Sequence, residues 1–135
     1  MDIIHLSKIT LNMYDEKLIS KCISLYKDGF GHLDAFNEEK MREQLRCGDV
    51  SWFVLVLRRE QGEMEPISAA VYYPRSPPFR LDTIWSLCTR RDMRGRGYAR
   101  RLLEYIRAGT KETIFMKADT AALATFYRSM GFVSL

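Results

Sequence analysis

The chain has 135 residues, of which 47% are hydrophobic and 28% charged, as is typical of one globular domain spanning residues 1–135. No apolar run approaches the roughly 18 residues of a membrane span, and the N-terminus lacks the basic segment of a secretory signal. The three cysteines show neither paired spacing nor a zinc pattern. We therefore expect no metal site, no membrane association and a reducing compartment, the cytoplasm or the nucleus.

Two helices and two strands are predicted in the first half of the chain. The first helix spans Asp15 to Lys27, with Asp15 as its N-cap and Gly29 as its stop. The second helix spans residues 37–47, with Asn37 as its N-cap. The strands "SWFVLVLRR" and "PISAAVYY" follow, and the polar "EQGEME" between them indicates an antiparallel hairpin. No element is predicted before Asp15.

Strands and helices alternate in the second half. The strand "LDTIWSLCT" leads through an arginine-rich turn into a helix that starts near Tyr98 and has Leu102 and Ile106 on one face. The strand "ETIFMKA", the helix "DTAALATFYRSM" and a short strand in "FVSL" follow. Because a strand–helix–strand unit forms a parallel crossover, we expect a mixed α/β sheet with helices on both faces. In such sheets a ligand binds at the C-terminal ends of the parallel strands.

The segment "RRDMRGRGYARRLLEYIR", residues 90–107, places seven arginines around two glycines, although the net charge of the chain is only +4. A helix N-terminus offers unpaired N–H groups and a partial positive charge, and Gly95 and Gly97 allow a ligand to approach the backbone. Arg94 and Arg96 add side-chain donors. The turn therefore predicts a phosphate site, with a turn of solvated arginines as the alternative. Its spacing is neither that of a dinucleotide GxGxxG nor that of a Walker A loop.

Two motifs then resemble one family. The strand end "LCT", the run Arg94-Gly-Arg-Gly-Tyr-Ala99 and the helix after it resemble the acetyl-CoA motif of the GCN5-related N-acetyltransferases (GNAT), Gln/Arg-x-x-Gly-x-Gly/Ala. The segment "ATFYRSMGF" is similar to the second signature of this family, Phe/Leu-Tyr followed four residues later by Gly-Phe. This resemblance implies a GNAT-like α/β fold with a mixed, mainly antiparallel sheet, helices on both faces and shortened C-terminal strands.

The same resemblance implies an N-acetyltransferase that transfers the acetyl group of acetyl-CoA directly to an amine. The amides of the turn would bind the coenzyme A pyrophosphate, and the strand before it would pair with the pantetheine arm. An amide of Leu87 or Cys88 would polarise the thioester carbonyl, and Tyr127 would protonate the leaving thiolate. The implied cofactor-binding residues are Leu87, Cys88, Thr89, Arg94, Gly95, Arg96, Gly97, Tyr98 and Ala99.

The general base stays open. Histone-type relatives have a glutamate on the strand before the first motif, where this chain has Thr83, and this departure weakens a histone-lysine assignment. The neighbouring Asp82 should face the other side of the sheet, because side chains alternate along a strand. A water chain or a remote residue such as Glu38 would serve instead.

Several residues have competing structural interpretations. Without the family motif, Tyr127 is a core tyrosine on a helix stripe. Cys88 is a small apolar filler rather than a nucleophile, since free cysteines are usually buried and inert. Trp85, Tyr72 and Tyr73 either line the acceptor pocket or belong to the core of the sheet.

A rival hypothesis is a non-catalytic module that keeps the fold and binds protein or nucleic acid through its arginine face. The intact run from Arg94 to Ala99 and the presence of Tyr127 favour the enzyme, and a nucleic-acid partner is not expected. The amine acceptor is left open among protein lysines and N-termini, polyamines, amino sugars and arylamines. The short segment after Gly131 predicts either an open sheet edge or an edge completed by a second chain in a homodimer.

Overall fold

The computed structural model describes residues 1–33, 36–75 and 81–134. Its strands join into one sheet in chain order, with antiparallel pairs from β1 to β4 and parallel pairs β4–β5 and β5–β6. This confirms the mixed, mainly antiparallel sheet. The elements are β1 (Asp2–Leu6), η1 (Leu11–Met13), α1 (Glu16–Phe30), α2 (Glu38–Cys47), β2 (Ser51–Arg58), β3 (Met64–Tyr73), β4 (Asp82–Thr89), η2 (Arg91–Met93), α3 (Tyr98–Ala108), β5 (Ile114–Met116), α4 (Ala121–Ser129) and β6 (Val133–Ser134).

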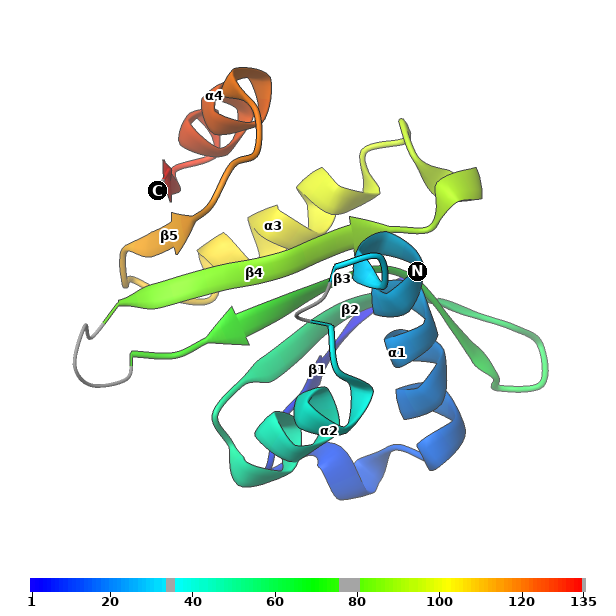
Figure 1. Ribbon diagram of the computed structural model, residues 1–135. Coiled ribbons are helices and arrows are strands. Elements are labelled where there is room, and N and C mark those ends of the chain that lie inside the picture. The colour runs from blue at the N-terminus through cyan, green and yellow to red at the C-terminus, as the bar shows by residue number, and fades with distance from the viewer. Residues whose placement is uncertain (34–35, 76–80, 135) are drawn as a thin grey trace.

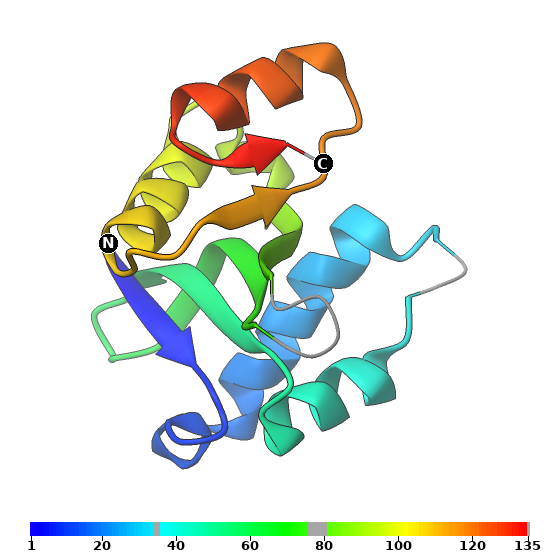
Figure 2. The same cartoon turned by 90° about the vertical axis from the view of Figure 1, so that its left-hand side faces the viewer.

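Helices lie on both faces of the sheet, as predicted (Figures 1 and 2). On one face α1 and α2 pack against a buried cluster that includes Trp52 and Val54 of β2. On the other face α3 and α4 pack against a second cluster that includes Leu55 of β2 and Ile84 of β4. Because β2 contributes to both clusters, its unbroken apolar run is buried on both sides. No helix within the described ranges is long and apolar enough to cross a membrane.

Side-chain caps begin three of the helices. The carboxylate of Asp15 accepts a hydrogen bond from the Leu18 amide at 2.9 Å, and Asn37 Oδ1 accepts one from the Lys40 amide at 2.9 Å. Thr120 caps α4 in the same way. The predicted stop at Gly29 is wrong, because α1 continues to Phe30. A helical glycine costs only about 1 kcal/mol relative to alanine, and the packing of α1 against the sheet outweighs that cost.

The first strand was missed by the sequence analysis. β1 pairs antiparallel with β2, in a register that sets Ile4 opposite Val54 and Leu6 opposite Trp52. Ile4 and Leu6 are buried in the cluster beneath α1. Their alternation is too short to predict a strand without knowing its partner, because an edge strand is stabilised mainly by the ladder it joins.

β4 departs from regular pairing in two ways that open space at its C-terminal half. The β3–β4 register shifts between Ala69 and Val71, and Ser86 on the bulged strand has a positive φ of 57°. The β4–β5 ladder extends only from Asp82 to Ile84 on the β4 side. Beyond this point the two strands diverge (Figure 1). The main chain at the end of β4 thus has one edge outside the β4–β5 ladder.

Candidate active site

The arginine-rich turn presents a helix N-terminus that is open to an anion. Gly97 is the N-cap of α3 and has a φ of 81°, and Gly95 has a φ of 76°. Such positive φ values favour glycine. No side chain caps α3, and no acidic residue lies in its first turn. The first amides of α3 are therefore left for a ligand to satisfy, and the helix dipole favours a negative charge there.

A surface pocket of about 320 Å³ lies over this turn. The ring of Phe126 on α4 forms part of its wall, with the Arg100 guanidinium carbon 5.0 Å from the ring centroid. The second sequence motif includes Phe126 but does not indicate that this residue lies beside the turn. The lining residues are Thr89, Met93, Arg94, Gly95, Gly97, Tyr98, Ala99, Arg100 and Phe126. Six predicted cofactor-binding residues are thus brought together, whereas Leu87, Cys88 and Arg96 lie outside this lining.

The arginines of the turn have different partners. Arg90 forms a two-bond ion pair with Asp92, with distances of 2.8 and 2.6 Å. Arg94 Nε donates to the Thr89 carbonyl at 3.1 Å. Arg96 lies outside the lining, and its guanidinium contacts the sulfur of the lining residue Met93 at 3.6 Å. Arg94 therefore ties the end of β4 to the glycine turn, while part of the charge of Arg90 is neutralised within the segment.

The main chain of β4 distinguishes the two amides that the sequence left open. The Arg90 amide donates to the Ile67 carbonyl on β3 at 2.8 Å, and the Cys88 carbonyl accepts from Ser68 Oγ on β3 at 3.0 Å. Because successive residues direct their main-chain groups to opposite sides of a strand, Leu87 and Thr89 face away from β3. Leu87 rather than Cys88 thus presents its amide toward the opening beside β5.

Tyr127 lies behind the pocket rather than in its lining. Its side chain is 7% exposed and belongs to the cluster against which Leu87 packs. Burial raises the pKa of its phenol, and the nearby Asp119 carboxylate adds to this effect. Within the described residues the hydroxyl has no hydrogen-bond partner. The phenol is therefore protonated at neutral pH and remains able to donate a proton.

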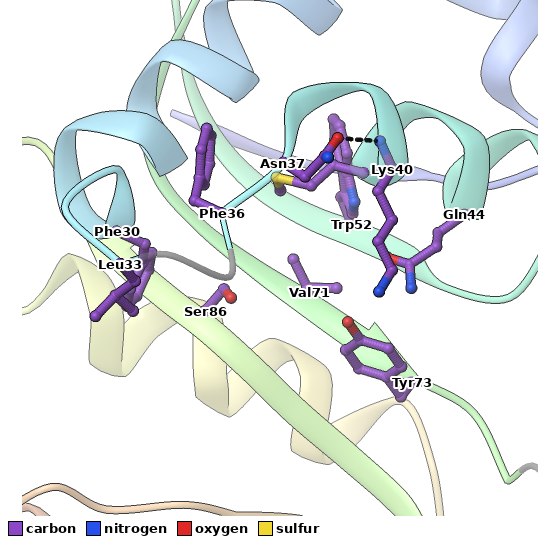
Figure 3. Close-up of a pocket in the computed structure, with 11 residues that line it drawn as sticks. Phe30, Leu33, Phe36, Asn37, Lys40, Gln44, Trp52, Val71, Tyr73 and Ser86 are labelled. Atoms are coloured by element: carbon purple, nitrogen blue, oxygen red, sulfur yellow. Dashed lines mark hydrogen bonds between the residues drawn. The ribbon is translucent and has the colours of Figure 1, made fainter.

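A second pocket, of about 200 Å³, lies on the opposite face of the sheet, between the α1–α2 region and strands β2 to β4. Figure 3 shows Ser86 near one end, Trp52 and Val71 along the middle, and Tyr73 at the other end. Its lining residues are Phe30, Leu33, Phe36, Asn37, Lys40, Met41, Gln44, Trp52, Val71, Tyr73 and Ser86. Because Ser86 precedes Leu87 on β4, this pocket adjoins the strand that leads to the arginine turn. We call it the acceptor pocket, after the role that we propose for it below.

The three aromatic candidates separate in the structure. Tyr73 lines the acceptor pocket. Tyr72 faces the other side of the sheet, where it packs with the α3 cluster and its hydroxyl donates to the Asp82 carboxylate. Trp85 is 40% exposed and lies outside the lining. Only one of the three therefore has the position expected of an acceptor-site residue.

The candidate bases are not gathered in the acceptor pocket. Asp82 is buried and bonded to Tyr72 on the opposite face, in agreement with the predicted alternation. Thr83 is paired with Tyr73 across the β3–β4 ladder. The Glu38 carboxylate lies 3.7 Å from Arg42 on the same helix and outside the lining. Among the described lining residues there is no carboxylate or imidazole, so the role of general base stays open.

The cysteines differ in their expected reactivity. Burial raises the pKa of Cys22 and of Cys88 to about 12, whereas Cys47 is exposed and its thiol donates to Glu43 Oε1 at 3.0 Å. Because the thiolate is the reactive form, we expect one thiol to react with Ellman's reagent in the native protein at pH 8 and three after unfolding. This supports the interpretation of Cys88 as a filler. Rapid modification of Cys88 in the folded state would contradict it.

The same shifts predict a loss of stability at alkaline pH. In the unfolded chain Cys22 and Cys88 ionise near their ordinary pKa of 9.0, but in the folded chain only near 12. Between these values the unfolded state binds fewer protons, so the free energy of unfolding falls as the pH rises. Urea denaturation at pH 8 and pH 10 measures this change. The free energy of unfolding should decrease less in a Cys22→Ala variant than in the wild type. Cys47→Ala, at the exposed cysteine, is the matched control.

Comparisons with known proteins agree with this geometry. The profile of the family described as "Acetyltransferase (GNAT) domain" matches residues 51–134, more than half of the chain. No curated protein sequence matches the chain. An acyl-CoA N-acyltransferase from Pseudomonas aeruginosa is similar in structure with a TM-score of 0.73 and 16% sequence identity, covering 99% of this chain and 89% of that one.

Two further solved structures share the fold. GCN5 from Tetrahymena has a TM-score of 0.69 and 15% identity, covering 95% of this chain and 77% of that chain. The acetyltransferase AAC(6')-Iy, solved in complex with the bisubstrate analog CoA-S-monomethyl-acetylneamine, has a TM-score of 0.68 and 14% identity, covering 97% and 89%. At these identities the likeness establishes the fold of this chain, and that fold is the one predicted from its motifs.

Proposed function

Because the chain belongs to the GNAT acetyltransferase family, we propose that it transfers the acetyl group of acetyl-CoA directly to a primary amine. The observation that carries this proposal is the uncapped N-terminus of α3, which forms a pocket beside the end of β4 where β4 and β5 diverge. The free amides at the N-terminus of α3 suit a pyrophosphate. The edge of β4 beyond the β4–β5 ladder suits an extended arm that contains amides. The bound CoA analog of AAC(6')-Iy supports the same ligand class.

In this proposal the amides from Arg94 to Ala99 bind the pyrophosphate, and Arg94 adds its guanidinium. The outward-facing main chain of Leu87 and Thr89 pairs with the pantetheine arm as a strand would. The Leu87 amide donates to the thioester oxygen, where negative charge develops during attack. The side chain of Cys88 is buried in the cluster beneath α1 and has no direct part in the reaction.

The proposed reaction passes through one tetrahedral intermediate. The neutral amine nitrogen attacks the thioester carbonyl carbon, and the carbon–sulfur bond then breaks to release a thiolate. The phenol of Tyr127 donates its proton to that sulfur. The attacking nitrogen loses a proton to water, and solvent returns a proton to the phenolate, so the products are an amide and CoA. Because the acceptor must be neutral, we expect turnover to rise with pH toward the pKa of the amine.

The experiment that tests the cofactor is a calorimetric titration with acetyl-CoA at physiological salt, with ATP as the control. Micromolar binding of acetyl-CoA and much weaker binding of ATP is the expected result, because both ligands carry phosphates but only one has a pantetheine arm. Equal binding of both would show that the arginine turn attracts phosphates in general. That outcome, with affinity falling steeply as salt rises, would favour the non-catalytic nucleic-acid module instead.

A further inference from the structure

One end of the acceptor pocket gathers hydrogen-bond donors whose presence acetyl transfer alone does not explain. The side chains of Lys40 and Gln44, one turn apart on α2, point toward the hydroxyl of Tyr73 at the end of β3 (Figure 3). We call these three residues the polar end. They come from two elements that are distant in the sequence, and all three line the same pocket.

The polar end carries the positive charge of Lys40. Lys40 forms no ion pair with the described residues, whereas Lys17 and Lys21 both pair with Glu63. Burial raises the pKa of Tyr73, so its hydroxyl stays protonated and able to donate. An ammonium flanked by neutral donors is suited to bind a carboxylate through charge-assisted hydrogen bonds.

The rest of the pocket is apolar. Trp52 and Val71 lie between the polar end and Ser86, and Phe36 lines the pocket near the Ser86 end (Figure 3). The buried indole N–H of Trp52 has no hydrogen-bond partner among the described residues, so this wall holds a further donor. The volume of about 200 Å³ is below the roughly 300–1,000 Å³ of pockets for drug-sized ligands. The occupant should therefore be compact.

We propose that the acceptor is a small amino carboxylate with an apolar side group, such as a hydrophobic α-amino acid. Its carboxylate binds the polar end, its side group contacts the apolar wall, and its amine lies at the Ser86 end beside the thioester. A polycationic acceptor would instead bring an ammonium to Lys40, and this like-charge contact is unfavourable. The assignment rests on the proposed function, because it identifies the acceptor of that reaction.

The test compares three acceptors that share one side group and differ at the carboxyl position, with spermidine as a polycationic acceptor. CoA release is measured with phenylalanine, phenylalaninamide, 2-phenylethylamine and spermidine, and kcat/KM is expressed per neutral amine, since the amine pKa differs among them. We expect phenylalanine to be preferred by roughly tenfold or more over phenylalaninamide and 2-phenylethylamine, which lack the carboxylate. One charge-assisted contact would give a preference of this size. Acetyl-CoA binding and thermal unfolding are measured in parallel.

Variants assign the preference to the polar end. Lys40→Met should remove most of the preference for phenylalanine over 2-phenylethylamine, and Lys111→Met, at an exposed position outside the pocket, should keep it. CoA release that favours spermidine, or the amines without a carboxylate, would overturn the acceptor class and leave acetyl transfer standing. Acetyl-CoA binding without CoA release from any acceptor would overturn the proposed function itself.

Discussion

Replacing Gly97 by aspartate is expected to weaken acetyl-CoA binding by roughly 100-fold, the equivalent of about 2.7 kcal/mol. Gly97 is the N-cap of α3, the position where an aspartate side chain accepts hydrogen bonds from the first amides of the helix. The new carboxylate would occupy the donors that a phosphate needs and would also repel it. Calorimetric titration with acetyl-CoA measures the change.

A matched substitution separates this effect from backbone strain. Gly62, in the β2–β3 turn, has a φ of 79°, and a Cβ added there or at Gly97 would have no atom beyond its chain neighbours within 4 Å. Gly62→Asp should therefore carry the same left-handed backbone cost as Gly97→Asp, roughly 1–2 kcal/mol, which thermal unfolding measures. It should leave acetyl-CoA affinity intact. If Gly62→Asp and Gly97→Asp bind acetyl-CoA with equal affinity, the turn does not bind the cofactor.

Removal of the Arg94 side chain should have a smaller effect. Its Nε–H donates to the Thr89 carbonyl, so Arg94→Ala removes both a tie between strand and turn and one positive charge. The backbone amides and the uncapped helix N-terminus remain. We expect a loss of about tenfold in acetyl-CoA affinity, in line with one charge-assisted contact.

The proposed cofactor half of the site could be predicted from the sequence because it is local. The turn, its glycines and the helix after it occupy consecutive positions, and the uncapped α3 follows from Gly97 at the N-cap. The caps at Asp15 and Asn37 were predictable for the same reason, since each needs only a side chain and an amide three residues later.

The proposed acceptor half could not be predicted because it is assembled from distant segments. Lys40 and Tyr73 share a pocket only because the sheet brings β3 beneath α2. The bulge that gives Ser86 its positive φ depends on the register of β4 against β3, which has no sequence signature here. The edge strand β1 was missed for a related reason, as its pairing with β2 is non-local.

The two aromatic residues of the second motif lie in different surroundings. The family motif includes both Phe126 and Tyr127, yet Phe126 lines the pocket over the turn and Tyr127 is buried behind it. Adjacent residues of a helix point about 100° apart, so one motif supplies a wall residue and a core residue. Tyr127 therefore has a structural role in the core, and substitution of its hydroxyl tests the catalytic role.

Tyr127→Phe is expected to lower the single-turnover rate of acetyl transfer by roughly 100-fold, the low end of what a general acid contributes. Acetyl-CoA affinity should stay within about twofold, because phenylalanine keeps the ring that packs in the α3–α4 cluster. The hydroxyl has no hydrogen bond to the described residues, so its removal leaves no buried partner unsatisfied. Single-turnover kinetics are required, since product release can limit kcat.

The pH profile distinguishes a proton donor from a packing residue. Burial raises the pKa of Tyr127 above its ordinary 10.0, so the phenol stays protonated at neutral pH. The wild-type rate should therefore fall only when the pH exceeds this raised pKa. In Tyr127→Phe this alkaline fall should vanish along with most of the rate. Tyr105→Phe, at a half-exposed position of α3, should change neither. A full rate in Tyr127→Phe would leave the buried phenol as a core residue, and water would then have to protonate the thiolate.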